Sequence, residues 1–253
     1  MALCRIQGNS LTQIPATQYA LEDLKERADL QALLRDHPEA IELGLFVIAE
    51  EYGEWEESRR RIDLLALDSE GQIVVIELKR TDDGGFMDLQ AVRYAAMVAG
   101  MTFDDMVRAH DAYVKARHID EEAKNRLLSF LGTDEESVAG VIGGGSPRII
   151  LMSAGFSREL TTAVLWLIDK GIDIRCVEMR PYRLGDDVLI DMTQVIPLAQ
   201  ASDYQVRIRR QAAAAVGVAR EATRRERTVR ILWRNNVIKG GDVIRLILPY
   251  IGL

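Results

Sequence analysis

The first third of the chain carries apolar positions that predict one helix followed by three short strands. Leucine and alanine recur at helical spacing over residues 18–35, and Pro38 comes just after that stretch. Three short apolar runs follow, at residues 45–49, 62–67 and 73–78. Each run is shorter than a typical helix and is bounded by polar or turn-forming residues, which is typical of a buried strand.

Residues 62–67 and 73–78 form the clearest predicted hairpin. The intervening residues 68–72 read DSEGQ, a turn signal in which Gly71 can adopt a positive φ. Both runs are apolar at nearly every position, so neither strand has a face reserved for solvent. We therefore expect the hairpin to lie centrally in a sheet that helices cover on both sides.

The alternation of strands and helices continues to about residue 198. Further helices are predicted at residues 87–99, 103–116, 120–131 and 157–170, and further strands at residues 148–153, 172–178 and 188–190. Ser157 is the expected N-cap of the last of these helices. The strand–helix–strand succession over residues 148–178 predicts a βαβ unit that extends the sheet, and hence an α/β fold.

A change in composition near residue 198 predicts a boundary between two parts of the chain. Residues 1–198 are predicted as the α/β domain and residues 199–253 as a basic helical C-terminal segment. Between Gln205 and Arg234 the chain has nine arginines against two glutamates, a local charge of +7 in a chain of net charge −7. Three interpretations stay open for these arginines: contact with a DNA backbone, a solvated helix face, or an element that joins two copies as a homodimer. The candidates for DNA contact in this segment are Arg207, Arg210, Arg224 and Arg225.

Composition narrows the class of protein. With 253 residues, 48% hydrophobic and 28% charged, the chain is long enough for a large core and is not globally disordered. Cys4 and Cys176 are far apart in the sequence, which excludes a disulfide-rich scaffold and a CxxC zinc site. No apolar run reaches the roughly 18 residues of a membrane-spanning helix, and the N-terminus lacks the pattern of a signal peptide. We therefore expect a cytoplasmic protein with no membrane partner.

Three charged residues stand inside the apolar hairpin. If the turn centres on Glu70, the numbers of paired residues sum to about 140, so Asp63 lies opposite Glu77 and Arg61 lies opposite Lys79. Directly opposed residues have Cβ atoms about 4.5–5.5 Å apart, and residues two apart on a strand share a face. Two carboxylates and an ammonium are therefore predicted to converge among isoleucine, leucine, alanine and valine.

Buried carboxylates this close do not both stay ionised without a counterion. Lys79 supplies one positive charge, and Mg²⁺ suits the pair better because it takes oxygen ligands from one or two carboxylates, water and phosphate. With a phosphodiester bound, such a metal would polarise an oxygen and lower the pKa of an attacking water. Lys79 would orient that water or stabilise charge on the phosphate oxygens.

This arrangement resembles a known nuclease family. Asp63, thirteen residues, and then Glu77-Leu78-Lys79 match the D…(D/E)-x-K signature of the PD-(D/E)XK nuclease superfamily. The stretches RRIDLLA at residues 60–66 and VVIELKR at residues 74–80 resemble the nuclease domain of the DUF91 group, which includes the NucS mismatch endonucleases. The resemblance implies a restriction-endonuclease-like mixed sheet flanked by helices, and DNA cleavage that depends on Mg²⁺ or Mn²⁺. Asp63 and Glu77 would be the metal ligands and Lys79 the catalytic lysine.

The resemblance also implies further site residues. Gln90 and Tyr94 lie at i and i+4 on the helix after the hairpin, similar to a Gln-x-x-x-Tyr pair that faces the site in related exonucleases. Related nucleases place a glutamate on the first helix, and Glu26 is the best candidate, with Glu22 second. For Tyr94 a place in the core, and for both glutamates a solvated helix face, are the structural alternatives. The region after residue 200 does not align with the mismatch enzymes, so their mismatch specificity is not transferred.

The expected function is that of a metal-dependent DNA nuclease, acting in DNA repair or defence. Arg61 and Arg80 flank the hairpin residues and are added as candidates for DNA contact. One alternative is a nucleic-acid-binding protein that keeps the nuclease fold without catalysis, since folds of this kind also serve as binding modules. Another is a protein-interaction module whose C-terminal helix mediates assembly.

Overall fold

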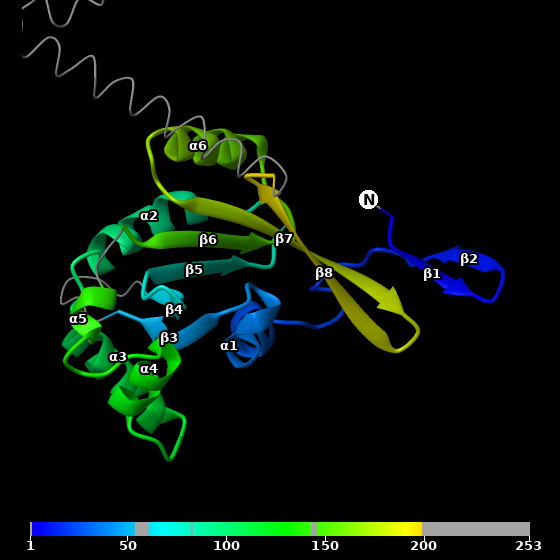
Figure 1. The fold of residues 1–253 in the computed structure, drawn as a ribbon. Coiled ribbons are helices and arrows are strands. Elements are labelled where there is room, and N and C mark those ends of the chain that lie inside the picture. Colours follow the sequence, from blue (N-terminus) through cyan, green and yellow to red (C-terminus); the bar gives the residue numbers. More distant parts are fainter. Residues whose placement is uncertain (1, 54–60, 82, 143–145, 199–253) are drawn as a thin grey trace, which may run out of the picture. The chain divides into compact units, whose positions relative to one another are not determined.

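A six-stranded mixed sheet forms the centre of the protein. The computed structural model describes residues 2–53, 61–81, 83–142 and 146–198, which belong to one compact unit, Met1–Leu198. The strand order is β3-β4-β5-β6-β7-β8, with β5, β6 and β7 parallel to one another and the remaining neighbours antiparallel (Figure 1). The strands are β3 (Leu45–Tyr52), β4 (Ile62–Asp68), β5 (Ile73–Lys79), β6 (Arg148–Ser153), β7 (Ile174–Leu184) and β8 (Asp187–Ile196). The predicted mixed α/β fold is confirmed.

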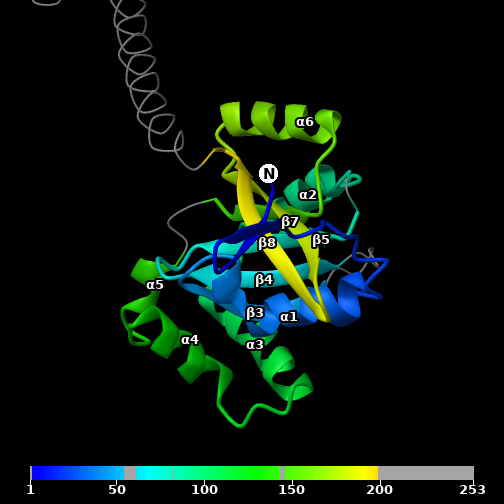
Figure 2. The ribbon, with the colours of Figure 1, turned by 90° about the vertical axis from the view of Figure 1, so that its right-hand side faces the viewer.

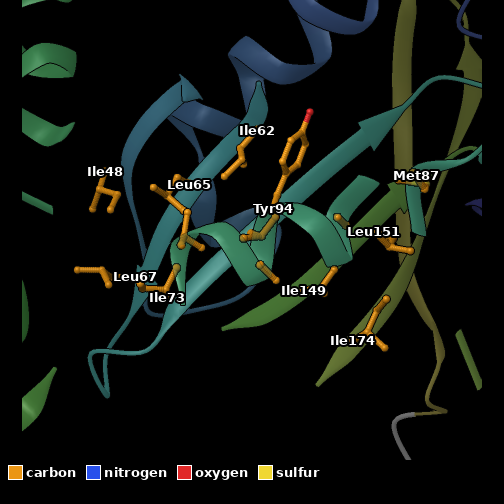
Figure 3. Close-up of a cluster of buried hydrophobic side chains, with 14 of the residues drawn as sticks. Ile48, Ile62, Leu65, Leu67, Ile73, Met87, Tyr94, Ile149, Leu151 and Ile174 are labelled. Carbon is orange, nitrogen blue, oxygen red and sulfur yellow. The ribbon is translucent and has the colours of Figure 1, made fainter. Parts of the chain in front are cut away.

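Helices cover both faces of this sheet. One face packs against α2 (Met87–Val98), α3 (Phe103–Ala116), α4 (Ala123–Leu131) and α6 (Arg158–Asp169). Figure 3 shows Leu65, Leu67 and Ile73 of the hairpin in this cluster, together with Met87 and Tyr94 of α2. The other face packs against a helical turn, η1 (Glu26–Gln31), and α1 (Ala32–Asp36), as Figure 2 shows for α1. The predicted central position of the hairpin is thus confirmed.

The hairpin has the register that its turn predicts. Leu64 pairs with Ile76 and Leu67 with Ile73, so each pair of residue numbers sums to 140. The Asp68 carboxylate accepts hydrogen bonds from the amides of Glu70 (3.0 Å) and Gln72 (2.9 Å), which closes the turn. Gly71 has φ +79°, and a Cβ at this position would lie 2.9 Å from the carbonyl oxygen of Val141. Glycine is therefore required both by the backbone and by the neighbouring helix α5 (Val138–Val141).

The predicted βαβ unit is also confirmed. Strands β6 and β7 are parallel and joined by α6, and the Ser157 hydroxyl accepts a hydrogen bond from the Leu160 amide (3.2 Å) as the predicted N-cap. The predicted strand at residues 188–190 is much longer in the structure, because β8 pairs with β7 along most of its length. In the same way β3 continues to Tyr52, beyond the predicted run at residues 45–49.

The prediction of one continuous helix over residues 18–35 is wrong. Helical structure begins only at Glu26, and residues 18–25 form turns around Tyr19, which is 1% exposed. The Tyr19 hydroxyl donates to the carbonyl oxygen of Met179 on β7 (2.8 Å). This contact holds the segment on the sheet and leaves Leu21 76% exposed. A contact between residues so far apart in the chain has no signature in the local periodicity.

Several elements were not predicted at all. A short η2 turn (Pro38–Ala40) precedes β3, and a separate two-stranded ribbon of β1 (Cys4–Gln7) and β2 (Ser10–Gln13) lies at the N-terminus. The predicted basic segment, with Arg207, Arg210, Arg224 and Arg225, lies outside the described residues, so the division after residue 198 stays a prediction. Within the described ranges, none of the helices is long and apolar enough to cross a membrane.

A buried arginine ties the strands together at the edge of the sheet where the β4–β5 turn lies. Arg148 is 5% exposed, and its guanidinium contacts Asp68 Oδ2 (2.8 Å) and Glu42 Oε2 (2.7 Å). Arg175, which is one-third exposed, shares Glu42 at 2.7 Å. A charge pair that is buried on both sides is costly to break, because the remaining carboxylates lose their counterion.

We therefore expect Arg148→Met to lower the free energy of unfolding by about 3 kcal/mol. The matched variant Arg175→Met removes a more exposed arginine from the same network and should cost less than about 1 kcal/mol. Denaturant unfolding followed by circular dichroism measures both values. Equal losses in the two variants would contradict the importance of burial at Arg148.

Candidate active site

The hairpin brings Asp63 beside the end of β5. The β4–β5 ladder pairs Leu64 with Ile76, one position short of Asp63 and Glu77. The backbone amide of Leu78, which follows Glu77 on β5, donates a hydrogen bond to Asp63 Oδ2 (2.8 Å). The Asp63 carboxylate is thereby fixed against the Glu77–Lys79 segment, as the register argument expected.

Glu77 is the most unusual of these residues. It is 0% exposed, and neither of its carboxylate oxygens has a hydrogen-bond partner among the described residues. Burial, and then the charge of Asp63, raise the pKa of Glu77 to about 9, although the charge of Lys79 and the backbone of Asp63 act in the opposite direction. An unpaired buried carboxyl group destabilises a fold unless something else in the functional state interacts with it.

Asp63 is also buried, but its carboxylate accepts a hydrogen bond from the Leu78 amide. It is 8% exposed, and burial raises its pKa to about 6. The Leu78 amide and the charge of Lys79 act in the opposite direction. In the absence of a cation, both carboxyl groups therefore hold their protons at higher pH than an exposed carboxyl group does.

Lys79 reaches from β5 to Glu26 on η1. Its Nζ lies 3.2 Å from Glu26 Oε1 and donates to the Leu78 carbonyl oxygen at 2.9 Å. The second oxygen of Glu26 accepts from the Arg80 amide at 2.9 Å. Burial lowers the pKa of Lys79, but the charges of Asp63 and Glu26 outweigh it, so the pKa is raised and the ammonium stays protonated. Of the two glutamates proposed from the sequence, the structure thus brings Glu26 to the cluster.

Glu22 is occupied elsewhere. Its carboxylate accepts from the Thr17 hydroxyl (2.7 Å) and from Arg183 (2.5 Å). Arg61 also differs from expectation, because β4 begins after it. Instead of lying opposite Lys79 in the ladder, Arg61 donates to the carbonyl oxygens of Glu51 (3.2 Å) and Gly53 (3.5 Å).

Gln90 and Tyr94 share a face of α2, as their spacing predicts. Gln90 Nε2 donates to the Tyr94 hydroxyl at 3.1 Å. Tyr94 is 2% exposed and belongs to the same buried cluster as Ile62, the residue before Asp63 (Figure 3). This position agrees with the core interpretation of Tyr94, and the catalytic role of the pair stays a prediction.

Two residues of the cluster were missed by the sequence analysis. Gln31 is 3% exposed, and its Nε2 donates to the Asp63 carbonyl oxygen (3.1 Å) and to Glu51 Oε1 (3.2 Å). Glu51 has a positive φ of 50°, and its charge raises the pKa of both Asp63 and Glu77. A polar Gln31 among apolar helix positions was a signal that could have been used. Glu51 stands in an acidic run and carried no comparable signal.

The donor atoms fit a hard divalent cation in their chemistry. The unpartnered oxygens of Glu77 and the adjacent carboxylate of Asp63 are the oxygen ligands that Mg²⁺ and Mn²⁺ take, with water and phosphate completing the shell. In the described part of the chain, no three histidine, cysteine, aspartate or glutamate side chains lie close enough together to form a preformed metal site with three protein ligands.

Comparison with protein families agrees with this geometry. Residues 26–130 match the endonuclease NucS C-terminal domain. The resemblance proposed from the sequence is therefore confirmed over about two-fifths of the chain. The NucS-matched segment begins at Glu26 and contains every candidate catalytic residue, from Glu26 to Tyr94. The β1–β2 ribbon and strands β6 to β8 lie outside it.

Comparison with whole proteins finds only weak similarity. No curated protein matches the chain. Among solved structures, a repair endonuclease from Pyrococcus abyssi shares 19% identity, with a TM-score of 0.34 over 61% of this chain and 47% of that chain. An EndoMS–dsDNA complex shares 19% identity, with a TM-score of 0.32 over 70% of this chain and 64% of that chain. This chain therefore spans about half to two-thirds of those proteins, and likeness at such TM-scores decides neither fold nor function.

Proposed function

We propose that this protein is a metal-dependent DNA nuclease that hydrolyses phosphodiester bonds and acts in DNA repair or defence. The observation that carries the proposal is the Glu77 carboxyl group, which is buried without a partner beside Asp63 and Lys79. The position of this cluster within the NucS-matched segment supports it. Asp63 and Glu77 would hold Mg²⁺ or Mn²⁺, which when bound supplies polarisation of a phosphate oxygen and a lowered pKa of water.

The other residues of the cluster have distinct proposed roles. Lys79 is held protonated, so its ammonium is suited to stabilise negative charge that develops on the phosphate oxygens. Glu26 contacts both Lys79 and the Arg80 amide, so it positions the lysine without needing to touch the substrate. Gln31 supports the backbone of Asp63 in the same way, and Glu51 accepts a second hydrogen bond from the Gln31 amide. Arg61 and Arg80 are exposed on either side and would contact DNA phosphates.

The proposal is tested by incubating the full chain with double-stranded, single-stranded and branched DNA. We expect cleavage of at least one of these in Mg²⁺ or Mn²⁺, and none in EDTA. Lys79→Ala should reduce the rate about a hundredfold or more, since it removes charge stabilisation at the phosphate. The control is Lys115→Ala, which removes an exposed lysine of α3 that pairs with Asp111. Cleavage that persists in Lys79→Ala would contradict the assignment.

The positioning role of Glu26 gives a separate prediction. We expect Glu26→Gln to lower kcat/KM by about tenfold to a hundredfold, as for residues that orient a catalytic group. The alkaline limb of the pH profile should also move to lower pH, because the Glu26 charge no longer helps Lys79 to keep its proton. Glu22→Gln is the matched control, since Glu22 contacts Thr17 and Arg183 instead. An unchanged pH profile in Glu26→Gln would show that Glu26 is only structural.

A second candidate function is DNA binding without catalysis. It is favoured by one observation, the lack of a preformed three-ligand metal site among residues 2–53, 61–81, 83–142 and 146–198. Salt-dependent DNA binding with no cleavage in any divalent metal would select it. Cleavage that requires both the metal and Glu77 would exclude it.

A further inference from the structure

The β1–β2 ribbon is a small sheet with solvent on both sides. Cys4–Gln7 and Ser10–Gln13 pair in antiparallel fashion, and all eight residues are exposed. Figure 1 shows the ribbon extending beyond the turn of the β7–β8 hairpin, away from the six-stranded sheet. A two-stranded hairpin has little stability of its own in water. Its complete exposure leaves both faces accessible to a molecule outside the chain.

The two faces of the ribbon differ in chemistry. The register Arg5↔Thr12 and Gln7↔Ser10 places a guanidinium, an amide and two hydroxyls on one face. The opposite face carries the pair Ile6↔Leu11. Guanidinium, amide and hydroxyl groups are the side chains that contact phosphates and base edges in DNA. The polar face thus has the functional groups of a DNA-binding surface.

The N-terminal residues 1–21, which include the ribbon, also differ in charge from the rest of the chain. The chain has 39 aspartates and glutamates, yet the first of them is Glu22, so residues 1–21 contain none. Arg5 is the single charged side chain in that stretch. In a protein of net charge −7, a projecting segment with one arginine and no acidic side chain does not repel a polyanionic partner.

The base of the ribbon is attached next to the candidate active site. The Thr17 amide donates to the Pro181 carbonyl oxygen (2.9 Å) and the Arg183 amide to the Pro15 carbonyl oxygen (3.1 Å), which anchors the ribbon to β7. Residues 16–20 then line a pocket of about 550 Å³, together with Arg80 and Arg180. No acidic residue lines this pocket, and Arg80 directly follows Lys79. The pocket therefore lies between the base of the ribbon and Arg80, although Glu22 contacts Thr17 and Glu26 contacts Lys79 at its two ends.

We propose that the β1–β2 ribbon is a DNA-docking arm, which places its Arg5–Gln7 face in a groove of duplex DNA on one flank of the cleavage position. A two-stranded ribbon has the width that the major groove of B-DNA admits. The inference rests on the proposed function, because it assumes that DNA is the substrate at Lys79. The arm lies outside the NucS-matched segment, so it adds a contact that the matched domain does not include.

An exposed cysteine in the ribbon allows a direct crosslinking test of DNA contact. Cys4 is exposed in β1, whereas Cys176, the other cysteine of the chain, is buried and burial raises its thiol pKa to about 12. A photoreactive maleimide on the full chain will therefore label Cys4 selectively. With a duplex of about three helical turns in EDTA, we expect adducts with DNA on one flank of the position that is cut when metal is added. Adducts only between two copies of the chain would overturn the inference and assign the ribbon to self-association.

One identical substitution on each face provides the matched comparison. Gln7→Glu places a negative charge on the polar face, and Gln13→Glu places the same charge on the opposite face. Both positions are exposed, so neither change should affect folding. We expect Gln7→Glu to weaken duplex binding about tenfold in EDTA, the loss of one groove contact, and Gln13→Glu to change it less than about twofold. Wild-type affinity in Gln7→Glu, or equal losses in the two variants, would overturn the inference.

These binding measurements separate the inference from the proposed function. Binding in EDTA needs no cleavage, so duplex affinity is measured independently of the nuclease reaction. If the wild type cleaves DNA and Gln7→Glu binds normally, the inference fails and the proposed function stands. If binding depends on Gln7 but no metal supports cleavage, the proposed nuclease activity fails and the docking arm stands.

Discussion

Glu77→Gln is expected to reduce metal-dependent DNA cleavage about a thousandfold or more, while raising the thermal stability of the metal-free protein at neutral pH. The two effects have one cause. Glutamine has nearly the shape of glutamate, so it fits the site, but it cannot supply the charged oxygens that a divalent cation requires. It also removes a wholly buried carboxyl group that is ionised in the unfolded chain at neutral pH but must take up a proton on folding, which costs free energy.

The comparison requires cleavage rates and melting temperatures for two variants. Glu70→Gln is the control, because Glu70 is an exposed residue in the turn of the same hairpin. It should leave both quantities unchanged. Normal cleavage by Glu77→Gln would remove Glu77 from the catalytic cluster. Loss of cleavage together with a lower melting temperature would instead indicate that Glu77 is needed for folding.

The second large effect is a dependence of stability on pH that divalent metal should reverse. The folded-state pKa values of Asp63 and Glu77 are raised above their values in an unfolded chain. The folded protein then binds more protons than the unfolded one, so this contribution to stability is present below about pH 4 and is lost as the pH rises towards about 9. A cation bound to the ionised pair opposes that loss, because binding to the folded state stabilises it.

Thermal unfolding in EDTA and in Mg²⁺ or Mn²⁺, at about pH 5 and about pH 8, measures this effect. We expect the metal to raise the melting temperature clearly at the higher pH and little at the lower, where protons compete for the same carboxylates. Glu77→Gln should abolish the difference. A metal effect of equal size at both pH values would place the binding site elsewhere.

The hairpin shows what short-range pattern can predict. The turn residues Asp68 and Gly71, together with the apolar strands on each side, predicted a register that the structure has. The relation of Asp63 to the Glu77–Lys79 segment then followed from strand geometry alone. Nothing in this argument needed a contact between distant parts of the chain.

The wrong and missed predictions concern features that local sequence patterns do not show. The expected helix begins late, at Glu26, because Tyr19 bonds to Met179, 160 residues away. Glu51 joins the cluster through its contact with Gln31, between a strand and a helix, which no local spacing reveals. The β1–β2 ribbon was missed because it has no buried face, and the prediction of strands relied on burial.

The tight turn at Gly71 has a consequence for variants of this protein. Any other residue there would meet both an unfavourable φ and the backbone of α5. The readiest relief is a shift of one strand along the other, which turns alternate side chains to the opposite face. Asp63 would then leave Glu77 although neither residue had changed. Loss of activity from a substitution at position 71 would thus result from a shifted strand register, and a compensating change in the length of the β4–β5 turn could restore the activity.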